Sequence, residues 1–160
     1  MNLRTPLLLA AAMLAGCSHV PLAKTAPTSR GVIEQVETTR DGTSTAATVD
    51  RYKADLAQRI YAVNSTQVFT TRPQALLRSV VVVKYTIDSG GNLVRSEIAR
   101  SNHDRTTEAT ALSTLRKSAP FPKPSPHLLR NGRLEVHESW LFNNDGRFQL
   151  RSLALAQMDE

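Results

Sequence analysis

Apolar residues recur between residues 50 and 65 at helical spacing. The apolar positions are Tyr52, Leu56, Ile60 and Val63. Their spacings of four, four and three place them on one face of an α-helix. Asp50 can cap the start by accepting a hydrogen bond from an early backbone N–H, and Asn64 and Ser65 are suitable terminators. The pattern predicts an amphipathic helix that faces a core, with a groove for a partner helix as the alternative.

Residues 79–87 alternate and are rich in β-branched side chains, which predicts a strand with one fully apolar face. Asp-Ser-Gly-Gly at residues 88–91 predicts a tight turn, and residues 93–100 a returning strand. Leu93 breaks the alternation of that second strand. A β-bulge would explain the break.

A second helix is predicted from Asp104 or Thr106 to Ser118, with apolar residues on one side and basic residues in its last turn. Four prolines between residues 120 and 126 forbid a helix and favour an extended path.

A third strand is predicted over residues 133–143, a turn at 144–146, and a short final strand that includes Phe148, Leu150 and Ser152. One face of the third strand carries Leu134, Val136, Glu138, Trp140 and Phe142. Trp140 and Phe142 are expected to belong to the core rather than to a sugar-binding platform. The succession of elements predicts an α+β fold.

The N-terminus carries a different pattern. Arg4 precedes an apolar run over residues 7–15, which is too short to span a membrane as a helix. Leu14-Ala15-Gly16-Cys17 resembles the lipobox of bacterial lipoproteins, which is cut before the cysteine. The resemblance implies lipidation of Cys17 and a periplasmic, outer-membrane-anchored protein, since Ser18 rather than Asp follows. A plain secretory signal and a buried free thiol are the alternatives.

These patterns divide the chain into a signal peptide (1–16), a lipidated flexible tether (17–48), a folded domain (49–155) and a tail (156–160). The chain has 20 Lys and Arg against 14 Asp and Glu. Its basic residues are spread out, with no basic run or interleaved aromatic platform, which argues against nucleic acid as a partner. A basic surface facing anionic lipid or polysaccharide is expected instead.

The domain resembles the C-terminal domain of the TonB family, with TolA nearer for the leading helix. The resemblance is carried by Val81-x-Val83-x-Tyr85-x-Ile87-Asp88, Gly91-Asn92-Leu93, Ile98-x-x-Ser101, Ala111-Leu112, Leu115 and Pro120-Phe121-Pro122. It implies a small antiparallel sheet of three, possibly four, strands with two helices packed on one side. Asn102, His103 and Thr107 depart from the family pattern.

In TonB the domain captures a receptor segment as an added strand, because an edge strand shows unpaired backbone groups. The third strand is the expected edge, or the short strand after Gly146 if that covers it. The candidate contacts are Arg133, Glu135, His137 and Ser139. The alternative is that these four are ordinary exposed residues of a half-buried strand.

The resemblance implies an envelope protein or receptor peptide as partner. A lipid anchor cannot relay a motor's movement through a bilayer, so we expect a passive binding lipoprotein without energy transduction. A permanent subunit of a transport or secretion assembly and a divergent energy-transducer component are the alternatives.

No catalytic site, metal site, cofactor or small-molecule substrate is expected. The chain's histidines are His19, His103, His127 and His137. They are dispersed and lack metal-site spacing. Ser101 lacks the context of a nucleophile elbow. His137 and Glu138 point to opposite faces of a strand and cannot act together.

Overall fold

The computed structural model describes residues 36–73 and 75–155. Cys17, the signal peptide and the tail 156–160 lie outside the described residues. The elements are α1 (Val49–Val63), η1 (Ser65–Gln67), β1 (Ser79–Asp88), β2 (Leu93–Arg100), α2 (Arg105–Lys117), η2 (Pro126–Leu128), β3 (Arg133–Phe142) and β4 (Phe148–Leu150). Within the described ranges, no helix is long and apolar enough to cross a membrane.

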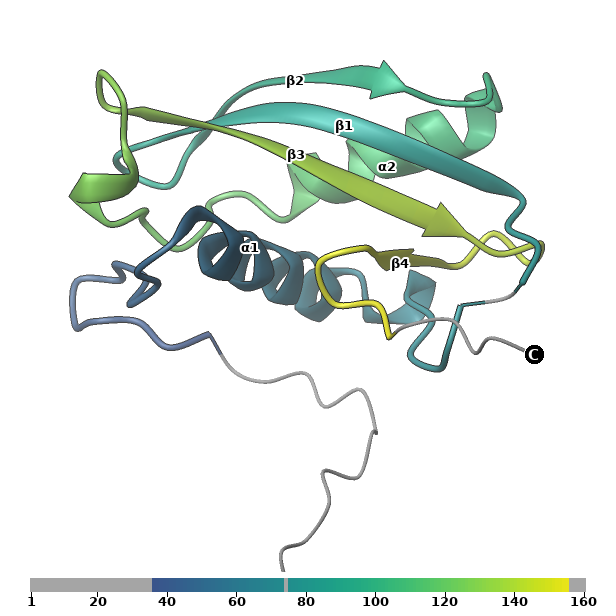
Figure 1. Ribbon diagram of the computed structural model, residues 1–160, viewed down its shortest axis with the longest axis horizontal. Coiled ribbons are helices and arrows are strands. Elements are labelled where there is room, and N and C mark those ends of the chain that lie inside the picture. The colour runs from purple at the N-terminus through teal and green to yellow at the C-terminus, as the bar shows by residue number, and fades with distance from the viewer. Residues whose placement is uncertain (1–35, 74, 156–160) are drawn as a thin grey trace, which may run out of the picture.

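The strands form an antiparallel sheet in the order β2-β1-β3-β4. Figure 1 shows α1 and α2 on the same side of this sheet. The expected α+β fold with both helices on one side is confirmed, and the sheet takes the four-stranded form. The opposite face of the sheet carries no further layer of the described chain, and we call it the open face.

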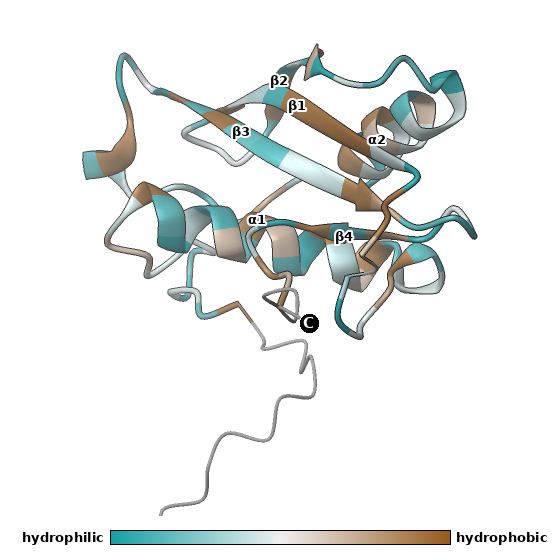
Figure 2. Cartoon of the chain, turned by 45° about the vertical axis from the view of Figure 1, so that its right-hand side comes forward, coloured by the Kyte–Doolittle hydropathy of each residue, from teal (hydrophilic) through white to brown (hydrophobic). Residues whose placement is uncertain are grey.

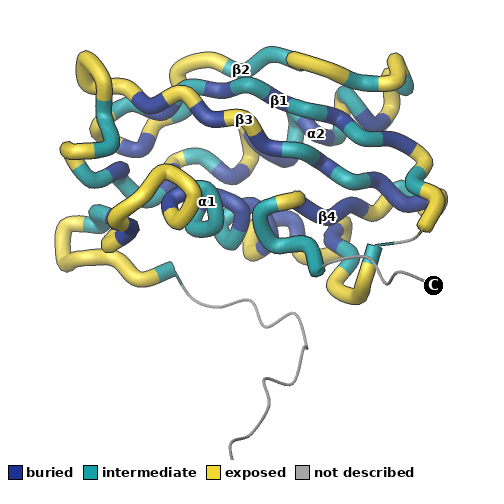
Figure 3. The backbone as a smooth tube through the Cα atoms, viewed as in Figure 1, coloured by how far each residue is buried: buried dark blue, intermediate teal, exposed yellow. Residues whose placement is uncertain are grey.

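The alternating pattern of β1 explains the two faces. Its odd-numbered residues, from Ser79 to Ile87, are buried under the helices, and its even-numbered residues are half-buried on the open face. The alternation along β1 and β3 is visible in Figure 3. Figure 2 shows apolar residues along β1, and apolar and polar residues mixed along β3 and both helices. Burial of apolar surface on the helix side therefore fixes the register of the sheet.

Large fully buried side chains come from both halves of the chain. They are Trp140, Tyr52, Tyr85, Phe142, Phe148, Leu56, Ile60, Ile87, Leu115 and Leu150. The indole Nε1 of Trp140 donates a hydrogen bond to Thr114 Oγ1 at 3.1 Å. Trp140 is thus a core residue tied to α2, as its place on the strand predicted.

Thr107 and Asn102, two of the residues that depart from the family pattern, are linked through Ser79 by hydrogen bonds. Thr107 is buried where a large apolar residue is usual, and its Oγ1 donates to Ser79 Oγ at 2.9 Å. The Ser79 hydroxyl donates in turn to Asn102 Oδ1 at 2.6 Å. The buried hydroxyls of Ser79 and Thr107 are therefore hydrogen-bonded, which offsets the cost of burying them.

The start of α1 differs from the prediction. Thr48, rather than Asp50, is the N-cap, and its side chain accepts a hydrogen bond from the Arg51 N–H at 3.3 Å. Asn64 ends the helix as predicted. For α2, Asp104 is the N-cap and accepts from the N–H groups of Thr106 and Thr107.

The last part of the predicted tether (17–48) packs against the domain. Ser44 and Ala46 are buried, and the Ser44 hydroxyl donates to Asp55 of α1. The Ser44 N–H donates to the Lys123 carbonyl, and the Lys123 N–H donates to the Gly42 carbonyl, both close to 2.9 Å. The small polar residues of this stretch thus supply hydrogen bonds to the proline-rich link, a long-range partner that composition does not reveal.

The imperfect alternation of β2 reflects irregular pairing, as predicted. Its register against β1 shifts twice, between Val82 and Val83 and between Thr86 and Ile87. The extra residues of β2 are left out of the ladder at both places, which is the signature of a bulge or similar irregularity.

Candidate partner-binding edge

β3 has one side fully paired and the other partly open. It pairs with β1 over ten consecutive residues, from Arg133 to Phe142. On its other side β4 pairs with residues 140–142, and one further bond runs from the Arg151 N–H to the Ser139 carbonyl at 3.0 Å. The chain then turns away, since Leu153 and Ala154 both donate to the Leu150 carbonyl. Residues 134–138 therefore have no strand beside them in the described part of the chain.

The direction of the backbone groups follows from these bonds. Ser139 points its carbonyl away from β1, so the residues of the same parity, Glu135 and His137, do so too. Arg133 is already satisfied, because it exchanges two hydrogen bonds with Arg130 at 2.8 and 3.1 Å. Glu135 and His137 thus present two N–H and two C=O groups to which no described backbone donates or accepts. We call residues 134–138 the free edge of β3.

The four predicted contact residues lie together. Arg133, Glu135 and His137 are exposed and Ser139 is half-buried. All four project from the open face, opposite Asp88, Thr86, Lys84 and Val82 of β1 in that order. Their role in binding remains a prediction. Two of them, Glu135 and His137, also carry the unpaired backbone N–H and C=O groups.

β2 forms the other border of the sheet, and the sequence pattern did not indicate it as an edge. Lys84 Nζ lies 2.5 Å from Glu97 Oε1, and Arg95 lies 2.6 Å from the other oxygen of that carboxylate. The hydrogen bond from Lys84 is the main reason that the pKa of Glu97 is lowered. Charges and bulges both discourage pairing at an edge, so β3 offers the more regular template.

A notch of about 270 Å³ lies where β4 stops. It is lined by Asp50, Lys53, His137, Glu138, Ser139, Arg151 and Ser152. β3 supplies one wall, the start of α1 the second, and the turn after β4 the third. The notch thus continues the free edge of β3 toward α1.

Glu138 is buried against this notch, with 3% of its surface exposed. Its Oε1 accepts a hydrogen bond from the Ser139 N–H at 2.7 Å, and Oε2 has no partner among the described residues. Burial raises the pKa of the Glu138 carboxyl, and the neighbouring polar groups of Ser152 and Ser139 and the charge of Lys53 oppose the rise. Sequence reasoning assigned this residue no role, although a carboxylate in an otherwise apolar row is the signal that could have found it.

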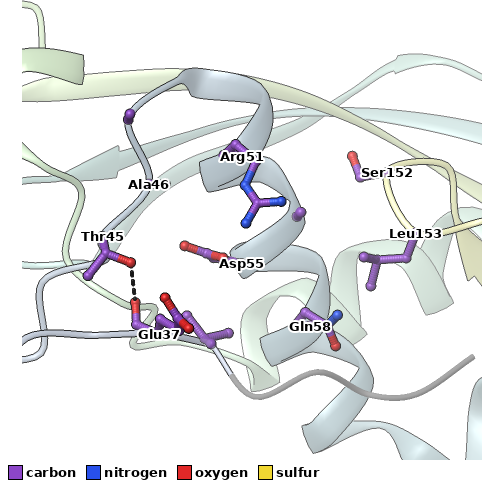
Figure 4. Close-up of a pocket in the computed structure, with 11 residues that line it drawn as sticks. Glu37, Thr45, Ala46, Arg51, Asp55, Gln58, Ser152 and Leu153 are labelled. Atoms are coloured by element: carbon purple, nitrogen blue, oxygen red, sulfur yellow. Dashed lines mark hydrogen bonds between the residues drawn. The ribbon is translucent and has the colours of Figure 1, made fainter. Parts of the chain in front are cut away.

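A second pocket, of about 500 Å³, lies between α1 and the segment that precedes it. Figure 4 shows Arg51, Asp55 and Gln58 on the α1 side, with Thr45 and Glu37 on the other. The Thr45 hydroxyl donates to the Glu37 carbonyl at 3.3 Å. This pocket shows that the segment before α1 forms part of the domain surface.

Residues suited to catalysis do not converge in the described chain. His103 is exposed in the loop between β2 and α2, His137 is exposed on β3, and the ring of His127 contacts the Ala47 carbonyl at 3.0 Å. In residues 36–73 and 75–155, no three His, Cys, Asp or Glu side chains form a group that could hold a metal ion. His137 and Glu138 occupy opposite faces of β3, as predicted.

The arrangement of helix, hairpin, helix and returning strand is that of a known family. A family model described as TonB C terminal matches residues 49–135. The chain belongs to the TonB C-terminal family. TonB C-terminal domains generally mediate protein interactions, are associated with the periplasm and envelope, and are in general non-catalytic. No curated protein and no solved structure matches the chain.

The match ends just inside β3. The free edge of β3 begins within the matched residues of this TonB C-terminal domain, whereas the notch, Glu138 and β4 depend largely on residues beyond them. The family match therefore covers the start of the free edge but not Glu138 or β4.

Proposed function

We propose that this protein is a lipid-anchored envelope lipoprotein whose TonB-like domain binds a partner protein by adding one of its strands to the free edge of β3. The outward-facing N–H and C=O groups of Glu135 and His137 carry the proposal. A partner strand would lie in line with β4 and fill the place where that strand stops. Cys17 would hold the protein to the outer membrane through its lipid.

The backbone contribution is modest. Four hydrogen bonds at about 0.5–1.5 kcal/mol each give roughly 2–6 kcal/mol before the cost of ordering the peptide. Side chains on the open face and in the notch must then supply the remaining affinity and the choice of partner. We infer that Arg133, Glu135, His137 and Ser139 supply the contacts on the open face.

The protein would work without a motor of its own. A lipid on the first residue ends within the bilayer and cannot pass a conformational change across it. Deletion that abolished energised uptake, with full rescue by a Cys17→Ser variant, would contradict this part of the proposal.

The test replaces His137 by proline and, separately, by alanine. Proline removes the outward N–H, whereas alanine removes the ring and keeps that donor. Strand addition predicts that His137→Pro weakens partner capture strongly and His137→Ala weakly. Because this N–H points away from β1, both variants should retain a cooperative thermal transition.

The partner is first identified by photo-crosslinking from position 137 in intact cells, with position 40 as the control. An adduct formed equally from both positions would count against a defined edge site. Equal loss of capture in His137→Pro and His137→Ala would assign binding to the side chain and would contradict strand addition.

A further inference from the structure

A groove of about 880 Å³ crosses the open face of the sheet, at the opposite end from Arg133 and Glu135. Its floor contains Val80 and Leu141, which pair across β1 and β3 and are half-buried. Its walls are the segment before β1, the residues after β2 and the residues after β4. The groove shares no lining residue with the free edge of β3, and Arg151 is the one residue that lines both the groove and the notch.

The charges around this groove have one sign. Arg78, Arg100 and Arg151 line it, together with no acidic residue. Arg78 is engaged by Asp104, with Nε 2.9 Å from Oδ2. Arg100 and Arg151 are exposed, and neither takes part in an ion pair within the described residues. An apolar floor between two available guanidinium groups fits an acidic, amphipathic ligand.

The sheet register gives the spacing of the two arginines. Arg100 pairs with Val82, Val82 pairs with Ser139, and the Arg151 N–H bonds to the Ser139 carbonyl. The four residues form one row across the sheet, and three inter-strand steps span roughly 14 Å. An extended peptide covers about 13 Å in four residues, so acidic side chains at positions i and i+4 would reach both arginines.

We propose that this groove, which we call the arginine groove, binds an extended acidic segment of a partner protein. The segment carries acidic residues four positions apart and an aliphatic residue midway, whose side chain rests on the floor. The raised walls favour a narrow chain over a flat lipid surface. The arginine groove thus gives the protein a second docking surface, which recognises the side chains of its ligand rather than pairing with the ligand's backbone.

The probe is a fluorescein-labelled peptide containing Glu-Ser-Leu-Ser-Glu, and its binding to the purified full-length protein is measured by fluorescence anisotropy. The matched control peptide contains Gln-Ser-Leu-Ser-Gln. Binding of the acidic peptide should weaken at high salt because the pairs are exposed. Arg100→Glu and Arg151→Glu should each weaken it about tenfold, and Arg40→Glu, at an exposed turn away from the groove, should leave it unchanged.

His137→Pro separates this proposal from strand addition, since it should not change binding of the acidic peptide. Equal affinity for the two peptides, or unchanged affinity in both groove variants, would overturn the proposal. So would binding of anionic lipid vesicles that depends on Arg100 and Arg151 when the peptide does not bind. Tighter peptide binding after removal of residues 156–160 would assign the groove to the chain's own acidic tail and also overturn it.

Discussion

At the scale of single residues, the buried carboxyl of Glu138 has a defined effect on stability. Its pKa is raised from 4.5 by burial, so the folded protein binds this proton more tightly than the unfolded chain. The ionised carboxyl therefore lowers the free energy of unfolding above the folded pKa. This destabilisation disappears as the pH falls through the folded pKa toward 4.5. Each unit of raised pKa corresponds to about 1.4 kcal/mol.

Glu138→Gln should remove this pH dependence. Glutamine retains an acceptor for the Ser139 N–H and carries no charge. The melting temperature of the variant relative to the unmodified protein should therefore be higher at pH 8 than at pH 5, and thermal unfolding at the two values measures it. An equal difference at both pH values would show that the carboxyl is not penalised in the folded state.

Sequence patterns predicted which residues share a face but not what surrounds each side chain. The orientation of Glu138 toward the core could be predicted, because it lies on the same strand face as Val136 and Trp140. That Oε2 of Glu138 would lack a hydrogen-bond partner could not be predicted in this way, because it depends on where the turn after β4 places Ser152. The exposure of Arg133, Glu135 and His137 was predictable for the same reason that their neighbours are buried.

At the scale of elements, the β1–β2 turn is fixed by its contact with the proline-rich link. Gly91 has φ +83°, and its carbonyl accepts from the Phe121 N–H at 2.9 Å. A Cβ at Gly91 would lie 2.2 Å from the Phe121 carbonyl oxygen. Gly146, in the β3–β4 turn, has a similar φ of +81° with nothing within 4 Å of a Cβ.

Gly91→Ala and Gly146→Ala therefore form a matched pair. Both substitutions meet backbone strain of about 1 kcal/mol, and Gly91→Ala also forces two backbones apart. We expect Gly146→Ala to cost about 1 kcal/mol and Gly91→Ala about 2–4 kcal/mol in urea unfolding. Equal costs would mean that the link can move away from the turn without loss of stability.

Local patterns predicted the order and type of the elements well. Helix periodicity, strand alternation, the Asp-Ser-Gly-Gly turn and the irregularity in β2 are all encoded within short windows. The docking of residues 38–48 on the link and the short overlap of β4 with β3 are not. These depend on contacts between segments about 80 residues apart or on where a turn interrupts a ladder, which no local pattern records.

At the scale of the whole molecule, the proposed anchor and the domain are joined through a segment that is partly folded onto the domain. Contacts with the domain begin before Val49, since Ser44 and Ala46 are buried. Any free tether would therefore end nearer to Val36 than to residue 48. This would hold the domain closer to the membrane than a tether of the predicted length.

Cys17→Ser should release the protein from the membrane fraction, because the sulfur that would carry the lipid is lost. Ser18→Ala, which keeps the cysteine, should remain with the membrane. Cell fractionation and intact-mass measurement of the N-terminus report the two effects. A Cys17→Ser protein that stayed in the membrane fraction would contradict lipid anchoring.

The early end of β4 has one further consequence. Extension of β4 to position 153 would place a residue opposite His137 and saturate its outward groups, and extension to position 155 would do the same for Glu135. A homologue with a final strand five residues longer would therefore complete its own sheet and leave no free edge for a partner strand. The length of the last strand, rather than the identity of any side chain, would then separate family members whose β3 edge is unpaired from those whose β3 edge is fully paired.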